Sequence, residues 1–130
     1  MNLDKPASFE ICQRFYFDAA HRLLRNLKDQ NEVEGSRRIH GHTYHAEVAV
    51  RGEPNPKTGM VMDLGLIRAE VEKVRALLDH HFLDEVADLG IPTLENLCAF
   101  IARKMQTPEL QLARVSVWRE ALGDRCDLRL

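Results

Sequence analysis

Hydrophobic and polar positions alternate along two segments in the first half of the chain. Within 11–21, every second residue belongs to the set Ile11, Gln13, Phe15, Phe17, Ala19 and His21. Within 39–51, the alternating set is His40, His42, Tyr44, Ala46, Val48 and Val50. Period-two alternation with aromatic and β-branched residues is typical of a strand. We therefore predict strands at 11–21 and 39–51.

Two later segments follow the three- and four-residue spacing of an amphipathic helix. The first follows Asp63, a suitable N-cap, and carries Leu64, Ile67, Val71, Val74 and Leu78. The second starts at Thr93, directly after Pro92, and ends before Pro108. It places Leu97, Ile101 and Met105 on one side. The spacing thus predicts one helix over 64–78 and another that begins at Thr93.

The remaining segments complete a ββααββ order within one domain, 1–130. Residues 113–120 and 127–130 are predicted as strands, 22–38 as a long loop, and 1–10 as a loose leader. Strands and helices segregated in this way indicate an α+β fold. We expect a four-stranded antiparallel sheet with two helices on one face. Its open edges favour pairing with another copy of the chain.

The composition limits the kinds of molecule that the protein is expected to bind. The 130 residues carry 18 basic and 20 acidic side chains, a net charge of −2, which does not favour a nucleic-acid partner. The apolar stretches are too short to span a membrane, and the N-terminal residues lack a secretory signal. The three cysteines are odd in number and widely spaced. They are therefore interpreted as reduced thiols of a cytoplasmic protein.

Histidines supply the first candidate chemistry. His40 and His42 are two residues apart in one predicted strand, so their side chains share a face. An antiparallel pairing with the preceding strand brings His21 close to them, whereas His45 has the opposite parity. Three imidazoles on one face suit a zinc ion with one open position. The alternative, that these are ordinary surface or core histidines, stays open on spacing alone.

A second cluster, Asp79, His80 and His81, directly follows the first predicted helix. An adjacent Asp–His pair can relay protons when the carboxylate orients the imidazole. The same residues could instead cap the helix, because histidine is favourable at the negative end of a helix dipole.

Six segments together resemble the family of 6-pyruvoyltetrahydropterin and 6-carboxytetrahydropterin synthases. They are FDAAH (17–21), HGHTY (40–44), GEPNPKTGMVMDL (52–64), LDHHFL (78–83), PTLEN (92–96) and VSVWRE (115–120). The resemblance implies the T-fold, an oligomeric barrel of three or six subunits with active sites at subunit interfaces. It also implies a small-molecule pterin substrate, 7,8-dihydroneopterin triphosphate or a relative.

The resemblance further assigns roles to individual residues. The implied zinc ligands are His21, His40 and His42. Asp79 and His80 would support a catalytic cysteine that acts as general base. The implied pterin-binding residues are Thr93, Glu95 and a glutamate in the last motif. The loop arginines Arg22, Arg25, Arg37 and Arg38 either bind the triphosphate or are solvated loop charges.

The sequence departs from the family pattern at the catalytic cysteine. The three positions at which family branches carry the base hold Ser36, Glu34 and Arg37. A serine hydroxyl is a poor base at neutral pH, so Glu34 is a possible alternative. Cys12 and Cys98 are expected far from the metal, and Cys126 cannot be placed. Whether Ser36 is natural or a replacement of the cysteine stays open.

A second departure is in VSVWRE, where Arg119 takes the position of the family's glutamate and Glu120 follows it. One residue along a strand switches the face. Either a bulge returns Glu120 to the pocket, or the pterin anchor is altered; we expect the bulge.

These observations favour a zinc-dependent, carbon–oxygen lyase-type pterin enzyme. The spacing around Ser36 is nearest the 6-carboxytetrahydropterin synthase branch of queuosine biosynthesis. The alternatives are a 6-pyruvoyltetrahydropterin synthase, a paralogue with changed chemistry such as a glutamate-based, aldolase-like cleavage, and a catalytically silent zinc- and pterin-binding protein.

Overall fold

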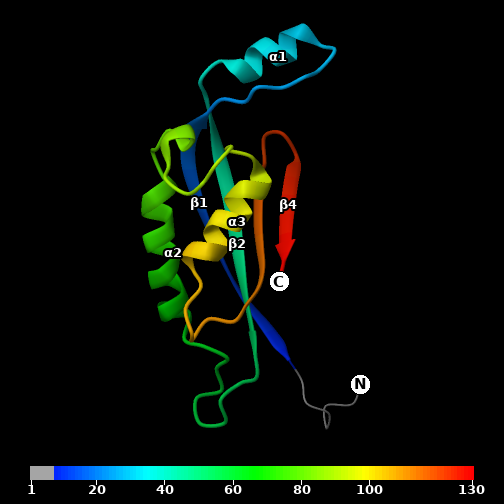
Figure 1. The fold of residues 1–130 in the computed structure, drawn as a ribbon. Coiled ribbons are helices and arrows are strands. Elements are labelled where there is room, and N and C mark those ends of the chain that lie inside the picture. The colour runs from blue at the N-terminus through cyan, green and yellow to red at the C-terminus, as the bar shows by residue number, and fades with distance from the viewer. Residues whose placement is uncertain (1–7) are drawn as a thin grey trace.

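One four-stranded antiparallel sheet, covered on one face by two helices, forms the body of the protein (Figure 1). The computed structural model describes residues 8–130. Its elements are β1 (Phe9–His21), α1 (Gln30–Arg37), β2 (His40–Gly52), α2 (Leu64–Leu78), the short 3-10 helix η1 (Leu83–Glu85), α3 (Leu94–Lys104), β3 (Leu112–Arg119) and β4 (Asp124–Arg129). The strands lie in the order β1-β2-β3-β4, which confirms the predicted α+β sheet.

The two longest strands pair along their whole length. The β1–β2 register runs from Phe9 opposite Gly52 to His21 opposite His40. Alternation along each strand buries Phe17 and Tyr44 on the face that the helices cover. The predicted strands match β1 and β2 to within two residues, because strict period-two alternation identifies a sheet with one buried face.

Both predicted helices begin at the predicted caps. The Asp63 carboxylate accepts a hydrogen bond from the backbone N–H of Gly65, and the Thr93 hydroxyl accepts one from Asn96. Each cap satisfies an amide that has no partner within the helix.

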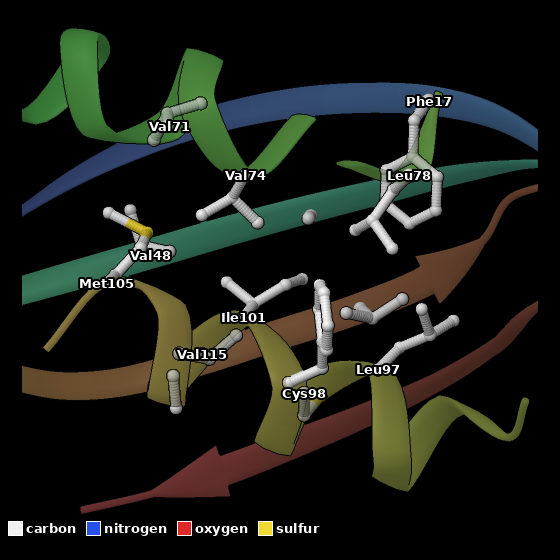
Figure 2. Packing of buried hydrophobic residues seen from close by; sticks show 14 of the residues in the cluster. Phe17, Val48, Val71, Val74, Leu78, Leu97, Cys98, Ile101, Met105 and Val115 are labelled. Atoms are coloured by element: carbon white, nitrogen blue, oxygen red, sulfur yellow. The ribbon is translucent and has the colours of Figure 1, made fainter. Parts of the chain in front are cut away.

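The core lies between these helices and the sheet (Figure 2). Leu78 of α2, Leu97 and Ile101 of α3, Val48 of β2 and Val115 of β3 are fully buried there. Burial of each such side chain contributes roughly 1.5–3 kcal/mol. This packing fixes the start of α3 against the sheet.

Several expectations need correction. The segment 22–38 is not a continuous loop, because α1 forms within it. The last strand starts at Asp124 rather than 127, and η1 was not predicted. The expected leader lies largely outside the described residues, but its last two residues belong to β1.

The strands β1 and β4 are the two edge strands of the sheet. Among residues 8–130, no helix is long and apolar enough to cross a membrane. The oligomeric barrel stays a prediction. The last residues of β1 bond to the segment after α2, where Ala20 N–H donates to His81 O, so further strands could pair with the rest of the β1 edge and with β4.

Candidate functional site

Three histidines meet where β1 ends and β2 begins. The register places His21 opposite His40 and Ala19 opposite His42, so all three imidazoles lie on the helix-covered face. The Nε2 atom of His21 is 3.0 Å from Nε2 of His40 and 3.1 Å from Nε2 of His42. The structure thus brings together the three histidines that strand parity groups.

Backbone carbonyls orient two of these rings. His21 Nδ1 donates to Pro92 O at 3.0 Å, and His40 Nδ1 donates to Arg38 O at 2.8 Å. A proton on Nδ1 leaves the lone pair of Nε2 free to bind a metal. The Tyr44 hydroxyl, 3.3 Å from His21 Nδ1, closes the buried side of the group.

Burial also favours the neutral form of two of these imidazoles. It lowers the pKa of His21, and burial together with the Arg119 cation lowers the pKa of His42 to about 4. A neutral imidazole is the form that binds a metal ion. Burial raises the pKa of Tyr44, which therefore remains a phenol.

The donor set fits a metal ion. Facing Nε2 lone pairs at 3.0 Å repel one another unless a cation lies between them. A tetrahedral zinc ion with Zn–N distances of about 2.0–2.1 Å separates its nitrogen ligands by about 3.3 Å, close to the spacing in this structure. Three protein ligands leave the fourth position of such an ion open.

A cavity of about 670 Å³ opens beside the histidines. Two expected pterin-binding residues, Thr93 and Glu95 at the start of α3, line it, and so does Ser36 of α1. The cavity therefore joins the triad to two segments that lie far apart in the sequence, α1 and the start of α3.

Ser36 is held in a polar cluster at the wall of this cavity. Its Oγ donates to Glu32 O at 2.9 Å and accepts from Arg25 Nη1 at 3.0 Å. Arg25 also pairs with the Glu32 carboxylate, at 3.1 Å from Nη2 to Oε1. Both Arg25 and Glu32 line the cavity. The loop thus places a carboxylate, a hydroxyl and a guanidinium together near the triad.

The structure places Glu34 elsewhere. Its carboxylate pairs with Arg37 at 3.5 Å on the exposed side of α1, and neither residue lines the triad cavity. Glu32, two residues earlier, is the carboxylate that lines the cavity, where the sequence analysis expected Glu34.

The other loop arginines also lie apart from the cavity. Arg22 borders a separate hollow beside Asp84, and Arg38 contributes its carbonyl to His40. Arg25 is therefore the one member of the expected phosphate-binding set that lines the cavity.

Arg119, not Glu120, faces the triad. The β3–β4 register continues without a bulge to Arg119 opposite Asp124, so the bulge that we expected is wrong. Arg119 Nη1 lies 3.3 Å from His42 Nε2. Glu120 instead accepts a hydrogen bond from Trp118 Nε1 at 2.8 Å and borders a different hollow.

Asp79 and His80 form a hydrogen-bonded pair outside the triad cavity. His80 Nδ1 donates to Asp79 Oδ2 at 2.9 Å, and the His80 side chain is 80% exposed. Hydrogen bonds from Asp18 N–H and from His80 lower the pKa of Asp79, so its carboxylate is charged. His80 lines a second hollow of about 500 Å³, which shares His42 with the triad cavity.

None of the three cysteines lines the triad cavity. Cys12 is exposed on β1, next to Arg114 on the sheet face opposite the helices. Cys98 is buried in α3 and donates to the backbone carbonyl of Cys126 at 3.4 Å. Burial raises the pKa of Cys98 to about 12, so its thiol is not a ready base.

Sequence reasoning missed Glu32 and Asp124 as cavity residues. A signal for Glu32 was present, because Asp29 and Glu32 have the spacing of a capping box. Asp29 does cap α1, accepting from the N–H groups of Asn31 and Glu32. Asp124 had no comparable signal, since its place depends on the β3–β4 turn.

Comparisons with known proteins agree on one family. The family model described as 6-pyruvoyl tetrahydropterin synthase matches residues 10–129. A dihydroneopterin monophosphate aldolase from Pyrococcus furiosus is 36% identical over 111 residues, which cover 83% of this chain and 87% of the relative. A 6-carboxy-5,6,7,8-tetrahydropterin synthase from Synechocystis is 34% identical over 102 residues, 74% of each chain.

A solved structure agrees with this grouping. The 6-pyruvoyl tetrahydropterin synthase of Caenorhabditis elegans superposes with a TM-score of 0.78 at 26% identity, covering 95% of this chain and 96% of the other.

Proposed function

The chain belongs to the 6-pyruvoyl tetrahydropterin synthase family, and from that premise we propose that it is a zinc-dependent lyase that cleaves the side chain of a 7,8-dihydroneopterin phosphate. The observation that carries the proposal is the composition of the triad cavity. It holds Glu32 and Ser36 but none of the cysteines. One relative is an aldolase of a dihydroneopterin monophosphate and another is a synthase of a 6-carboxytetrahydropterin, so both carry out pterin chemistry but different reactions.

A carboxylate base suits an aldol-type cleavage. In that reaction a base takes the proton of the hydroxyl on the second side-chain carbon. The bond between the first and second carbons breaks, its electrons pass into the pterin ring, and a proton returns to the first carbon. The products are a 6-hydroxymethyl pterin and glycolaldehyde phosphate, with no other reactant needed. This proton comes from oxygen, whereas pyruvoyl formation requires removal of a proton from carbon.

The residues of the cavity divide these tasks. When bound by the triad, a zinc ion would supply Lewis acidity that makes a side-chain hydroxyl easier to deprotonate. Glu32 accepts that proton as general base. Arg25 holds the carboxylate toward Ser36 and can donate to a phosphate oxygen. Glu95 and Thr93 present acceptors to the aminopyrimidinone edge of the pterin.

A second candidate is the 6-carboxytetrahydropterin synthase reaction. It is favoured by Ser36, which lies in the cavity at the position that resembles the catalytic cysteine of that branch. Arg25 donates to the Ser36 hydroxyl, so an anionic oxygen there would be stabilised.

Product analysis separates the candidates. The zinc-loaded protein is incubated with 7,8-dihydroneopterin monophosphate and, separately, triphosphate, and the products are identified by mass spectrometry. We expect 6-hydroxymethyl-7,8-dihydropterin and glycolaldehyde phosphate. A 6-carboxy or 6-pyruvoyl pterin would establish a synthase instead. No turnover of either substrate, with the metal bound, would contradict the proposed lyase activity. A Ser36→Cys variant run in parallel reports whether a thiol redirects the products.

We further propose that the active oligomer joins two chains at each site. His80, which is hydrogen-bonded to Asp79, lines a hollow separate from that of Glu32 and the triad, so one chain does not present all of these groups to one cavity. Asp79 and His80 would then serve the cavity of a neighbouring copy, with His80 as the proton relay.

Mixing inactive variants tests this arrangement. Chains carrying His21→Ala and chains carrying His80→Ala are expected to regain activity when coexpressed, because one site in the mixed oligomer then has both native residues. His21→Ala mixed with Glu32→Gln is the matched control and should remain inactive, since both residues line one chain's cavity. Failure of the first pair in oligomers shown by native mass spectrometry to be mixed would contradict the shared site.

A further inference from the structure

The cavity contains a guanidinium that points at the histidine triad. Arg119 ends β3 opposite Asp124, and its side chain is 17% exposed. Both residues line the triad cavity. The family pattern described above has a glutamate at this position, so the charge here is reversed.

The hydrogen bonds of Arg119 fix its direction. Its Nε donates to Asp124 Oδ1 at 2.9 Å, and its Nη2 donates to Asp124 Oδ2. The remaining nitrogen, Nη1, donates to His42 Nε2 at 3.3 Å. The carboxylate therefore holds two nitrogens of the guanidinium and directs the third at the triad.

A metal ion at the triad removes this last acceptor. The lone pair of His42 Nε2 would then bind the metal and could no longer accept from Arg119 Nη1. A partly buried charged donor without an acceptor is unfavourable. Since the three ligands are neutral imidazoles, they also leave the metal's charge uncompensated. One negatively charged oxygen beside the metal would accept the hydrogen bond from Arg119 Nη1. It would also offset part of the metal's charge.

We propose that Arg119 makes this cavity selective for pterins whose six-position substituent carries a negatively charged oxygen. This inference rests on the proposed pterin function and specifies the ligand. A guanidinium has donors but no acceptor, so it cannot bind the N–H groups of the aminopyrimidinone edge as a glutamate can. The substituent at the six position, rather than the ring edge, therefore faces Arg119, while Glu95 remains available to the ring.

Binding of two pterins that share one ring tests the inference. Pterin-6-carboxylate and 6-hydroxymethylpterin are titrated into the zinc-loaded protein, and binding is followed by pterin fluorescence. We expect the carboxylate to bind at least about tenfold more tightly, since charge-assisted hydrogen bonds are the stronger ones. Arg119→Gln should remove this preference, and Arg119→Lys should keep part of it.

The controls separate charge, folding and function. Arg129→Gln removes one positive charge from an exposed site on β4 and should leave the preference intact. Arg119→Gln combined with Asp124→Asn avoids an unpaired carboxylate. Zinc content and thermal melting are measured for each variant. Equal binding of both pterins, or a preference that survives in folded Arg119→Gln, overturns the selectivity. Absence of binding by either pterin overturns the proposed pterin function itself.

Discussion

Replacing His21 with alanine is expected to lower zinc affinity more than about 100-fold and to abolish turnover. Its Nε2 atom is within 3.1 Å of the Nε2 atoms of both other histidines, so its loss leaves no three-ligand site. Changes to residues that merely support a metal ligand already cost about 10–100-fold in affinity. Loss of the ligand itself should therefore cost more. The measurement is competition with a chromophoric zinc chelator, together with metal content per chain.

His45→Ala is the matched control for this variant. His45 lies in β2, like two of the ligands, but on the opposite face, where its ring stacks on Trp118 with 5.8 Å between centroids. It should bind zinc like the unchanged protein. Thermal melting gives an independent readout, because zinc at 1,000 times its Kd stabilises the folded state by about 4.1 kcal/mol. Unchanged zinc affinity and stabilisation in His21→Ala would show that the triad is not the metal site.

Side chains alternate between the two faces of a strand, and this alternation explains which part of the site could be predicted from the sequence. His40 and His42 share a face because they are two residues apart, and a paired preceding strand can only bring His21 to them from the same face. Parity also places Arg119 toward the triad. We expected otherwise because the family that the sequence resembles has a glutamate at this position and Glu120 follows it. The register instead runs regularly to Arg119, and Glu120 accepts a hydrogen bond from Trp118.

The helix α1 could not be predicted from the hydrophobic pattern of the sequence. Its eight residues bury only Val33 and Ser36, so the segment has almost no hydrophobic periodicity. The Asp29 cap and the Arg25–Glu32 ion pair stabilise it instead, through contacts that depend on the path of the preceding loop. The resemblance points to Glu34 because it holds one of the family's base positions, but α1 brings Glu32, and not Glu34, to the cavity.

Replacing Glu32 with glutamine is expected to lower kcat by at least about 100-fold, since a positioned general base contributes about 10²–10⁴-fold. The amide keeps the size of the side chain and its capacity to accept from Arg25, but it cannot take a proton. Zinc affinity should be unchanged, because Glu32 is not a member of the triad. The measurement is steady-state turnover of the dihydroneopterin phosphate by the zinc-loaded variant.

Two neighbouring variants decide whether this loss identifies the base. Glu34→Gln removes the same charge from the same helix, but its carboxylate pairs with Arg37 away from the cavity, so turnover should be unaffected. Ser36→Ala removes a hydroxyl that Arg25 contacts, and a smaller loss than that of Glu32→Gln is expected. Full activity in Glu32→Gln with inactivity in Ser36→Ala would assign the proton transfer to the serine. Inactivity in Glu34→Gln alone would require α1 to present its other face to the substrate in the active oligomer.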